Sequence, residues 1–248
     1  MADWRGACLG VVLTTAALAF ATAARAAPDL SGMWVLTTGE TSVVHLSDLS
    51  LTPLGRARME ARQKEIANGF PVSEGHLKCD PAGMPQMMSA PFGIQIMQND
   101  NRILIAPEVS NLPRTIFFRA AHLGPDDLNP SWNGDSIGHW EGDVLVVDTI
   151  GFNDEDAFDF NFDPPVKRTS ALRIVERMHL EQGGARLVDD MTLIDPLTFT
   201  APAKVSYVYR KLPADAGLME YVCEVDIPAL QAFEAQKTDK TPAYNHPF

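Results

Sequence analysis

The stretch PSWNGDSIGHWEGDVLVVDTIGFND, residues 130–154, decides the fold of this chain. Within it, residues 136–140 alternate small or polar groups with larger ones, and residues 144–150 form a β-branched run. β-Branched residues favour strands, and the Glu141-Gly142-Asp143 sequence between the two segments is typical of a tight turn. The stretch therefore predicts a β-hairpin.

Segments of strand length and composition flank this hairpin on both sides. Turn sequences separate them at a spacing near ten residues, and no helical pattern intervenes. We therefore predict a mainly β protein, an antiparallel meander closed into a calycin- or lipocalin-like barrel of about ten strands, because closure removes exposed edges. A β-sandwich is the alternative. The expected strands are 30–36, 92–98, 103–109, 115–119, 136–140, 144–150, 171–180, 186–194, 204–212 and 218–225.

Two helices accompany the predicted barrel. Thr52 can cap a helix that has Pro53 in its first turn and ends at Gly69, and a short helix follows Pro228 near the C-terminus. The apolar positions of the first helix are Leu54, Ala57, Ala61 and Ile66, which we expect to face the sheet.

The N-terminus predicts the compartment. Arg5 precedes an apolar run over residues 7–24, and Ala24-Arg25-Ala26 matches the small-x-small cleavage pattern of a signal peptide. We predict a signal peptide at 1–26, a single β-barrel domain at 27–248 and a periplasmic or secreted protein with no membrane attachment after cleavage. A lipid anchor at Cys8 is the alternative.

The charge balance excludes classes of partner. The chain carries 20 basic and 32 acidic side chains, a formal net charge of −12. Such an acidic surface repels phosphate backbones and anionic membrane surfaces, so nucleic-acid binding and peripheral membrane binding are not expected.

Cys79 and Cys223 remain after cleavage and, in an oxidising compartment, are predicted to form a disulfide. The alternative is a nucleophilic or metal-binding thiolate, which needs a nearby histidine or second ligand.

Candidate acid–base residues lie in and beside the central hairpin: Asp135, His139, Asp148 and Asn153. Paired carboxylates can divide acid and base roles when their environments separate their proton affinities, and a histidine titrates near neutral pH. The alternative is that the Asp and Asn residues bond their own backbone in turns and that His139 faces solvent.

Candidate ligand contacts are aromatic, thioether and cationic residues: Trp132, Trp140, Met87, Met88, Arg173 and Tyr207. Methionines fit irregular ligands but also fill gaps beneath long loops, so both interpretations stay open. By strand alternation, either Glu176 or Arg177 should point inward, where a charge needs a partner.

The chain has no phosphate loop, dinucleotide fingerprint, nucleophile elbow or zinc spacing, so we predict no cofactor and no metal. The acidic stretch DEDAFDFNFD at 154–163 lacks the glycine and glutamate of an EF-hand loop, which leaves only a non-standard calcium site open.

Several motifs together resemble a widespread bacterial family of exported proteins: SGMW, LTPLGRARMEAR, CDPAGMPQMM, SALRIVERMHL, EYVCE and a core of the form W-x-G-x-S-I-G-x-W-E-G-D-x-L-V-V-D-T-x-G-F-N-D. The resemblance covers nearly all of the mature chain. In that family histidine often stands at the position of Asp135, arginine at those of Gln86 and His139, and histidines near Arg168 and Arg173. This chain departs at each place, so any activity here would depend on Asp135, His139 or the neighbouring carboxylates.

Two classes of function fit these observations. The first is a periplasmic barrel that holds a small, mainly apolar or aromatic molecule in its interior. The alternative is a cofactor-independent lyase, isomerase or hydrolase that uses Asp and His in the same cavity. A structural or envelope protein with a filled barrel is the third possibility. The oligomeric state does not follow from the sequence.

Overall fold

The computed structural model describes residues 26–41, 44–45, 48–69, 78–110, 112–154, 158–159, 162–163, 166–225 and 227–240. Residues 1–25 of the predicted signal peptide, and part of the acidic stretch 154–163, lie outside the described residues.

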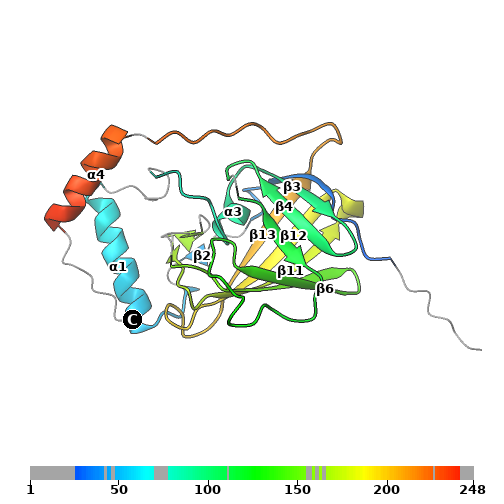
Figure 1. The fold of residues 1–248 in the computed structure, drawn as a ribbon, viewed down its shortest axis with the longest axis horizontal. Coiled ribbons are helices and arrows are strands. Elements are labelled where there is room, and N and C mark those ends of the chain that lie inside the picture. The colour runs from blue at the N-terminus through cyan, green and yellow to red at the C-terminus, as the bar shows by residue number, and fades with distance from the viewer. Residues whose placement is uncertain are drawn as a thin grey trace, which may run out of the picture.

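The described chain forms a closed nine-stranded barrel, which confirms the predicted mainly β fold (Figure 1). Around the barrel the order is β1-β13-β12-β11-β7-β6-β5-β4-β3. The strands are β1 (Gly32–Leu36), β3 (Gly93–Gln98), β4 (Arg102–Pro107), β5 (Arg114–Phe117), β6 (Asp135–Glu141), β7 (Val144–Ile150), β11 (Arg173–Glu181), β12 (Arg186–Ile194) and β13 (Ala203–Lys211).

One pairing departs from the predicted antiparallel meander. β5 and β6 run parallel, with Ile116 opposite Ser136 and Phe117 opposite Ile137. Nine strands cannot alternate in direction all the way around a closed barrel, so one adjacent pair has to be parallel. A parallel pair needs a crossover in place of a tight turn, and residues 118–134 supply it.

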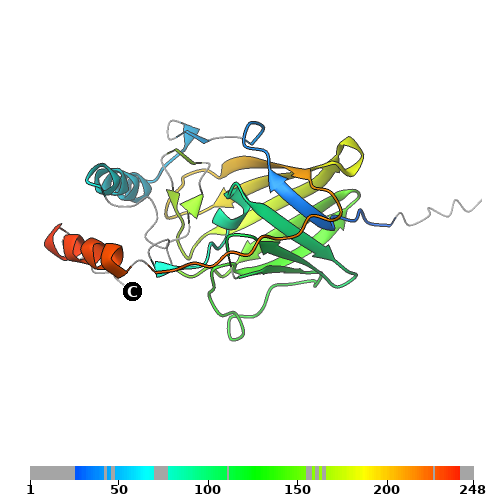
Figure 2. The ribbon, with the colours of Figure 1, turned by 90° about the horizontal axis from the view of Figure 1, so that it is seen from above.

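The predicted strand at 218–225 is wrong. This segment is not part of any sheet and runs along the outside of the barrel toward α4 (Ile227–Lys240), as the orange chain in Figure 2 shows. The barrel already closes between β1 and β13, so no open edge remains for a tenth strand. The large apolar side chains Met219 and Val222 are therefore exposed, at 68% and 69%.

The disulfide between Cys79 and Cys223 is present, as predicted. It joins the 212–225 segment to the loop that leads into α3 (Gln86–Ser89). The Met219 backbone amide adds a 3.1 Å hydrogen bond to Glu108. None of the helices in the described residues is long and apolar enough to cross a membrane.

Helix α1 (Pro53–Ala67) begins with the predicted cap, because the Thr52 hydroxyl accepts a 2.9 Å hydrogen bond from the Gly55 amide. Its buried face differs from the prediction: Gly55, Met59 and Arg62 are buried, whereas Leu54 is exposed. A Cβ on residue 55 would lie 2.2 Å from the Thr198 carbonyl oxygen, so the glycine lets the helix approach the turn before β13.

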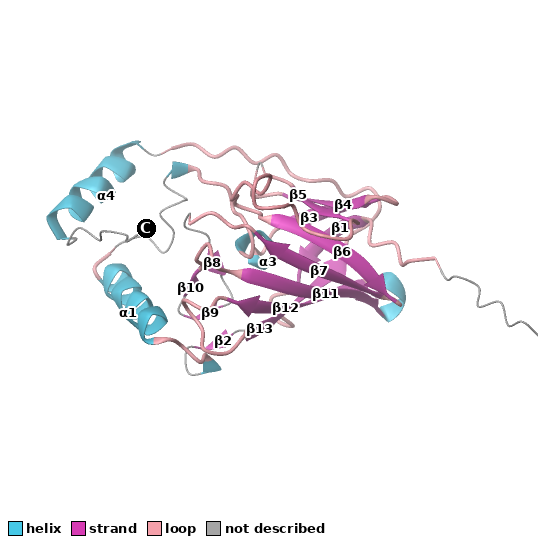
Figure 3. Cartoon of the chain, turned by 60° about the horizontal axis from the view of Figure 1, so that its bottom comes forward, coloured by secondary structure: helices cyan, strands magenta, loops and turns pink. Residues whose placement is uncertain are grey.

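The end of the barrel that faces α1 and α4 carries α3 and two small sheets (Figure 3). These sheets pair β2 (Val44–His45) with β9 (Phe162–Asp163), and β8 (Phe158–Asp159) with β10 (Val166–Lys167). The backbone amide of Met84 donates to the Trp132 carbonyl at 3.1 Å, and the Tyr209 hydroxyl donates to the Met88 carbonyl. Both contacts hold the α3 loop, residues 78–91, on the barrel.

Side-chain alternation along the central hairpin sets the two faces of the wall. Asp135 pairs with Ile150, and Ile137 pairs with Asp148. Ser136 and Thr149 point inward, where they are buried and hydrogen-bonded to each other at 2.9 Å. Asp135 and Asp148 therefore point to the outside of the barrel.

Candidate functional site

A buried polar cluster lies inside the barrel, and five neighbouring strands each contribute one side chain to it. These are Arg114 from β5, Ser136 from β6, Thr149 from β7, Glu176 from β11 and Asp189 from β12. All five are buried, with at most 1% of their surface accessible. We call them the interior cluster.

Arg114 is the centre of the interior cluster, and its guanidinium donates four hydrogen bonds. It makes a bidentate pair with Glu176, with one bond of 2.8 Å and one shorter contact, and it also donates to Ser136 at 3.1 Å and to Thr149 at 2.9 Å. Neither charge of the pair is exposed. Such a pair persists in a barrel interior only when its hydrogen bonds are satisfied.

Asp189 is the member of the interior cluster that has no cationic or hydroxyl partner. Among the described residues no donor reaches either oxygen of its carboxyl, and its side-chain hydrogen bond is with another acid, Glu176. Burial raises the pKa of Asp189 well above its ordinary value, and the negative charge of Glu176 raises it further. The interior cluster therefore holds Glu176 paired with Arg114, beside an Asp189 carboxyl whose raised pKa favours the protonated form.

Flexible apolar side chains surround Asp189. Met178 on β11 and Tyr207 on β13 stand directly opposite it, and Met191 follows on the same face of β12. All three are buried. The acid group thus sits among thioether and aromatic side chains, an environment that suits a mainly apolar molecule with one polar group.

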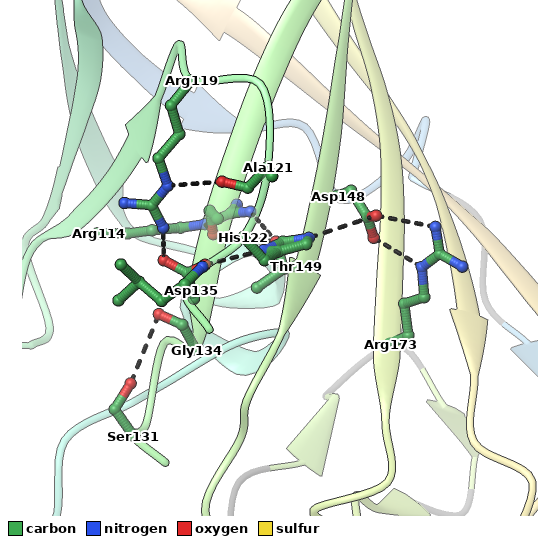
Figure 4. Close-up of polar contacts among 12 residues, drawn as sticks. Arg114, Arg119, Ala121, His122, Ser131, Gly134, Asp135, Asp148, Thr149 and Arg173 are labelled. Atoms are coloured by element: carbon green, nitrogen blue, oxygen red, sulfur yellow. Dashed lines mark hydrogen bonds and ion pairs between the residues drawn. The ribbon is translucent and has the colours of Figure 1, made fainter. Parts of the chain in front are cut away.

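A second cluster lies on the outer face of the barrel, where the crossover covers β6 and β7 (Figure 4). The His122 ring contacts both outward carboxylates, Asp135 at 2.8 Å through Nδ1 and Asp148 at 3.4 Å through Nε2. Arg119 pairs with Asp135, and Arg173 binds Asp148 through two hydrogen bonds of 2.7 and 2.8 Å. We call these five residues the outer cluster.

The charges of the outer cluster are mutually compensated. Burial alone would raise the pKa of Asp135, but hydrogen bonds from Arg119, His122 and the Leu123 amide outweigh it, so the pKa lies below its usual value. Burial alone would also raise the pKa of Asp148. The hydrogen bonds and charges of Arg173 and His122 outweigh burial, so this pKa too lies below its usual value. The cluster fastens the crossover to the wall by ion pairs that need both carboxylates ionised.

Replacing Asp135 with asparagine should lower the free energy of unfolding near neutral pH by about 1 to 3 kcal/mol, because Arg119 and His122 lose a buried charged acceptor. A lowered folded-state pKa stabilises above the unfolded value of about 3.9, and this stabilisation is lost as the pH falls through the folded value. The gap between wild type and Asp135→Asn should therefore close in acid. Urea unfolding at several pH values measures it. Asp126→Asn, an exposed acid on the same crossover, is the charge-matched control. A gap that does not depend on pH would contradict the prediction.

The predicted acid–base residues are placed as follows. Asp135 and Asp148 meet through His122, but on the outer face and not in an interior cavity. His139 also points outward, with 66% of its side chain exposed, and contacts Glu141 at 3.3 Å. Asn153 accepts two 2.6 Å hydrogen bonds from Arg168, one through its carbonyl and one through its side chain. The four residues therefore do not form one site.

The predicted ligand-contact residues divide between the interior and the surface. Met87 and Met88 are fully buried in α3, Tyr207 is fully buried on β13, and Trp140 is partly buried against the core. Trp132 is half-buried and contacts the α3 loop through its carbonyl. Arg173 lies on the outer face with Asp148.

Sequence reasoning missed Arg114, Arg119, His122 and Asp189. It did predict that one of Glu176 and Arg177 points inward, and Glu176 does so. His122 had one available signal, the connection 118–134, because so long a connection between strands is uncommon and often functional. Comparison of the chain with models of known protein families and with curated proteins finds no match.

Proposed function

We propose that this protein is an exported barrel that holds a small, mainly apolar or aromatic molecule in its interior. The observation that carries the proposal is the number of adaptable side chains inside. Five methionines have at most 1% of their surface accessible, namely Met84, Met87, Met88, Met178 and Met191. Unbranched thioethers re-pack around an irregular ligand more readily than branched side chains do, and a barrel of about eight strands is wide enough either for its side chains to fill or for one small ligand.

The α3 loop supports the proposal because it covers one end of the barrel without belonging to its wall. Met84, Met87 and Met88 pack into the core from this loop. The loop is held by single contacts to Trp132 and Tyr209 and by the disulfide. Displacing it would withdraw these methionines from the core and open that end of the barrel, while every strand pairing would stay intact.

Export is supported by the predicted signal peptide, by the resemblance to a family of exported proteins and by the Cys79–Cys223 disulfide, which persists in oxidising compartments. The acidic charge suits a soluble carrier of neutral molecules better than a carrier of anions.

Native mass spectrometry of the full, disulfide-bonded chain, purified without denaturation, tests the proposal. We expect a population with the added mass of a retained small molecule. The double variant Met178→Ile and Met191→Ile, whose stiff β-branched side chains keep a similar volume, should lower the bound fraction several-fold. Met97→Ile, on the exposed face of β3, should leave it unchanged. A wild-type chain that never carries added mass would contradict the proposal.

A second candidate function is acid–base catalysis, which one observation favours: His122 contacts two carboxylates while keeping 16% of its side chain accessible. Such a site would act on the outer face. If the retained molecule is converted by the wild type and His122→Gln abolishes that conversion, the enzymatic alternative holds; if the molecule is released unchanged by both, the outer cluster only fastens the crossover.

A further inference from the structure

The interior cluster contains two carboxyl groups but one guanidinium. Glu176 makes two hydrogen bonds with the guanidinium of Arg114, whereas Asp189 makes no hydrogen bond with it among the described residues. Glu176 lies opposite Met191 and therefore diagonal to Asp189 on the adjacent strand, with both side chains inward. Two such acids cannot both be ionised in a dry interior, so the one without a cationic partner keeps its proton.

Arg114 is a poor partner for an anionic ligand. Its guanidinium makes four hydrogen bonds to Glu176, Ser136 and Thr149, so a ligand carboxylate could bind it through two hydrogen bonds only by displacing one of these. The same anion would also meet the charge of Glu176. The interior thus discriminates against molecules with a negative charge.

A buried carboxyl whose only side-chain partner is another acid destabilises a core, so its presence calls for an explanation. The side chains beside it are Met178 and Met191, which are flexible enough to move, and the ring of Tyr207, which is a flat apolar surface. A molecule that displaced the thioethers would bring its own polar atom against Asp189.

We propose that Asp189 anchors the molecule held in the barrel by donating a hydrogen bond from its neutral carboxyl to a carbonyl, ether or hydroxyl oxygen. The ligand class is a neutral, mainly aromatic or aliphatic molecule with one such oxygen. This inference rests on the proposed function and adds to it the chemical identity of the ligand and the residue that selects it.

Two fluorescent probes test the anchor: the naphthyl ketone prodan, which is neutral, and a dimethylamino-naphthoate that carries a carboxylate in place of the ketone. Prodan should bind the wild type saturably with a blue-shifted emission, and at least about tenfold more tightly than the naphthoate. Asp189→Leu should weaken prodan binding about tenfold, whereas Asp189→Asn, which still donates from a neutral group, should stay within about threefold. Asp190→Leu, the exposed neighbour on β12, is the matched control and should change nothing.

The pH profile provides a second readout that does not depend on a variant folding. Prodan affinity of the wild type should fall as the pH rises and Asp189 loses its proton, while Asp189→Asn should show no such fall. Thermal unfolding verifies that each variant is folded, and Asp189→Leu should unfold at or above the wild-type temperature because it removes a buried acid that lies beside a second acid.

The outcomes separate the two proposals. Equal prodan binding by wild type and Asp189→Leu, or preference for the naphthoate, would overturn the anchor but leave interior binding standing. A wild type that binds neither probe overturns the anchor, and a chain that also carries no retained mass overturns the binding function itself.

Discussion

Glu176→Gln should lower the free energy of unfolding by about 3 to 5 kcal/mol, because it leaves the buried guanidinium of Arg114 without its counter-charge. Guanidinium chloride unfolding followed by circular dichroism measures the loss. Part of it can be offset, since the carboxyl of Asp189 also interacts with Arg114 and would release its proton more readily. Glu176→Gln combined with Asp189→Asn should therefore lose more than either change alone.

The same strands supply the control for this prediction. Glu141 pairs with Arg177, the residue after Glu176, but on the exposed outer face. Glu141→Gln should have little or no effect on stability, because exposed ion pairs are worth little. Replacing both Arg114 and Glu176 with methionine should restore most of the stability lost by the single variant. A similar loss for Glu176→Gln and Glu141→Gln would show that burial does not decide the cost.

Gly134→Ala should destabilise the protein by about 3 kcal/mol or more, because a strained backbone and a steric clash act at one position. Gly134 has a φ of +66°, and a Cβ there would lie 2.5 Å from the Ile150 carbonyl oxygen and 3.0 Å from the Thr149 side chain. The change would push apart β6 and β7 next to both clusters. Thermal or chemical unfolding of the purified variant measures the cost.

Gly142 provides a control with matched backbone geometry. Its φ is +63°, but nothing lies within 4 Å of the position of a Cβ. Gly142→Ala should therefore cost only about 1 to 2 kcal/mol, the strain of the left-handed conformation. If the two alanine variants are equally stable, the close packing at Gly134 does not matter and the prediction fails.

The barrel was predictable because the local sequence of most of its strands is typical of a β-strand. The central hairpin and the strand 186–194 combine β-branched residues with tight turns, and β7 and β12 have the predicted bounds. The prediction of a strand at 218–225 failed because it depends on residues far away in the sequence. The composition of this segment suits a strand, but a strand also needs a free edge, and the pairing of β1 with β13 removes the last one. Composition does not reveal where a barrel closes.

The site was only partly predictable, for the same reason. Alternation along one strand predicted that either Glu176 or Arg177 points inward, and Glu176 does so. Its partners Arg114 and Asp189 come from β5 and β12, and only the registers between strands bring them together. His122 depends on the parallel pairing of β5 with β6, which follows from having nine strands instead of ten. Local patterns predict single strands, whereas sites depend on how the strands are paired.

The oxidised and reduced forms of Cys79 and Cys223 differ in whether the α3 loop is covalently tethered to the 212–225 segment. Neither cysteine belongs to a strand of the barrel, so a reduced chain would keep its wall and both polar clusters. It would lack the tether that joins the 212–225 segment to the α3 loop. Under the proposed function, oxidation after export would add the covalent restraint that keeps the α3 loop over the end of the barrel.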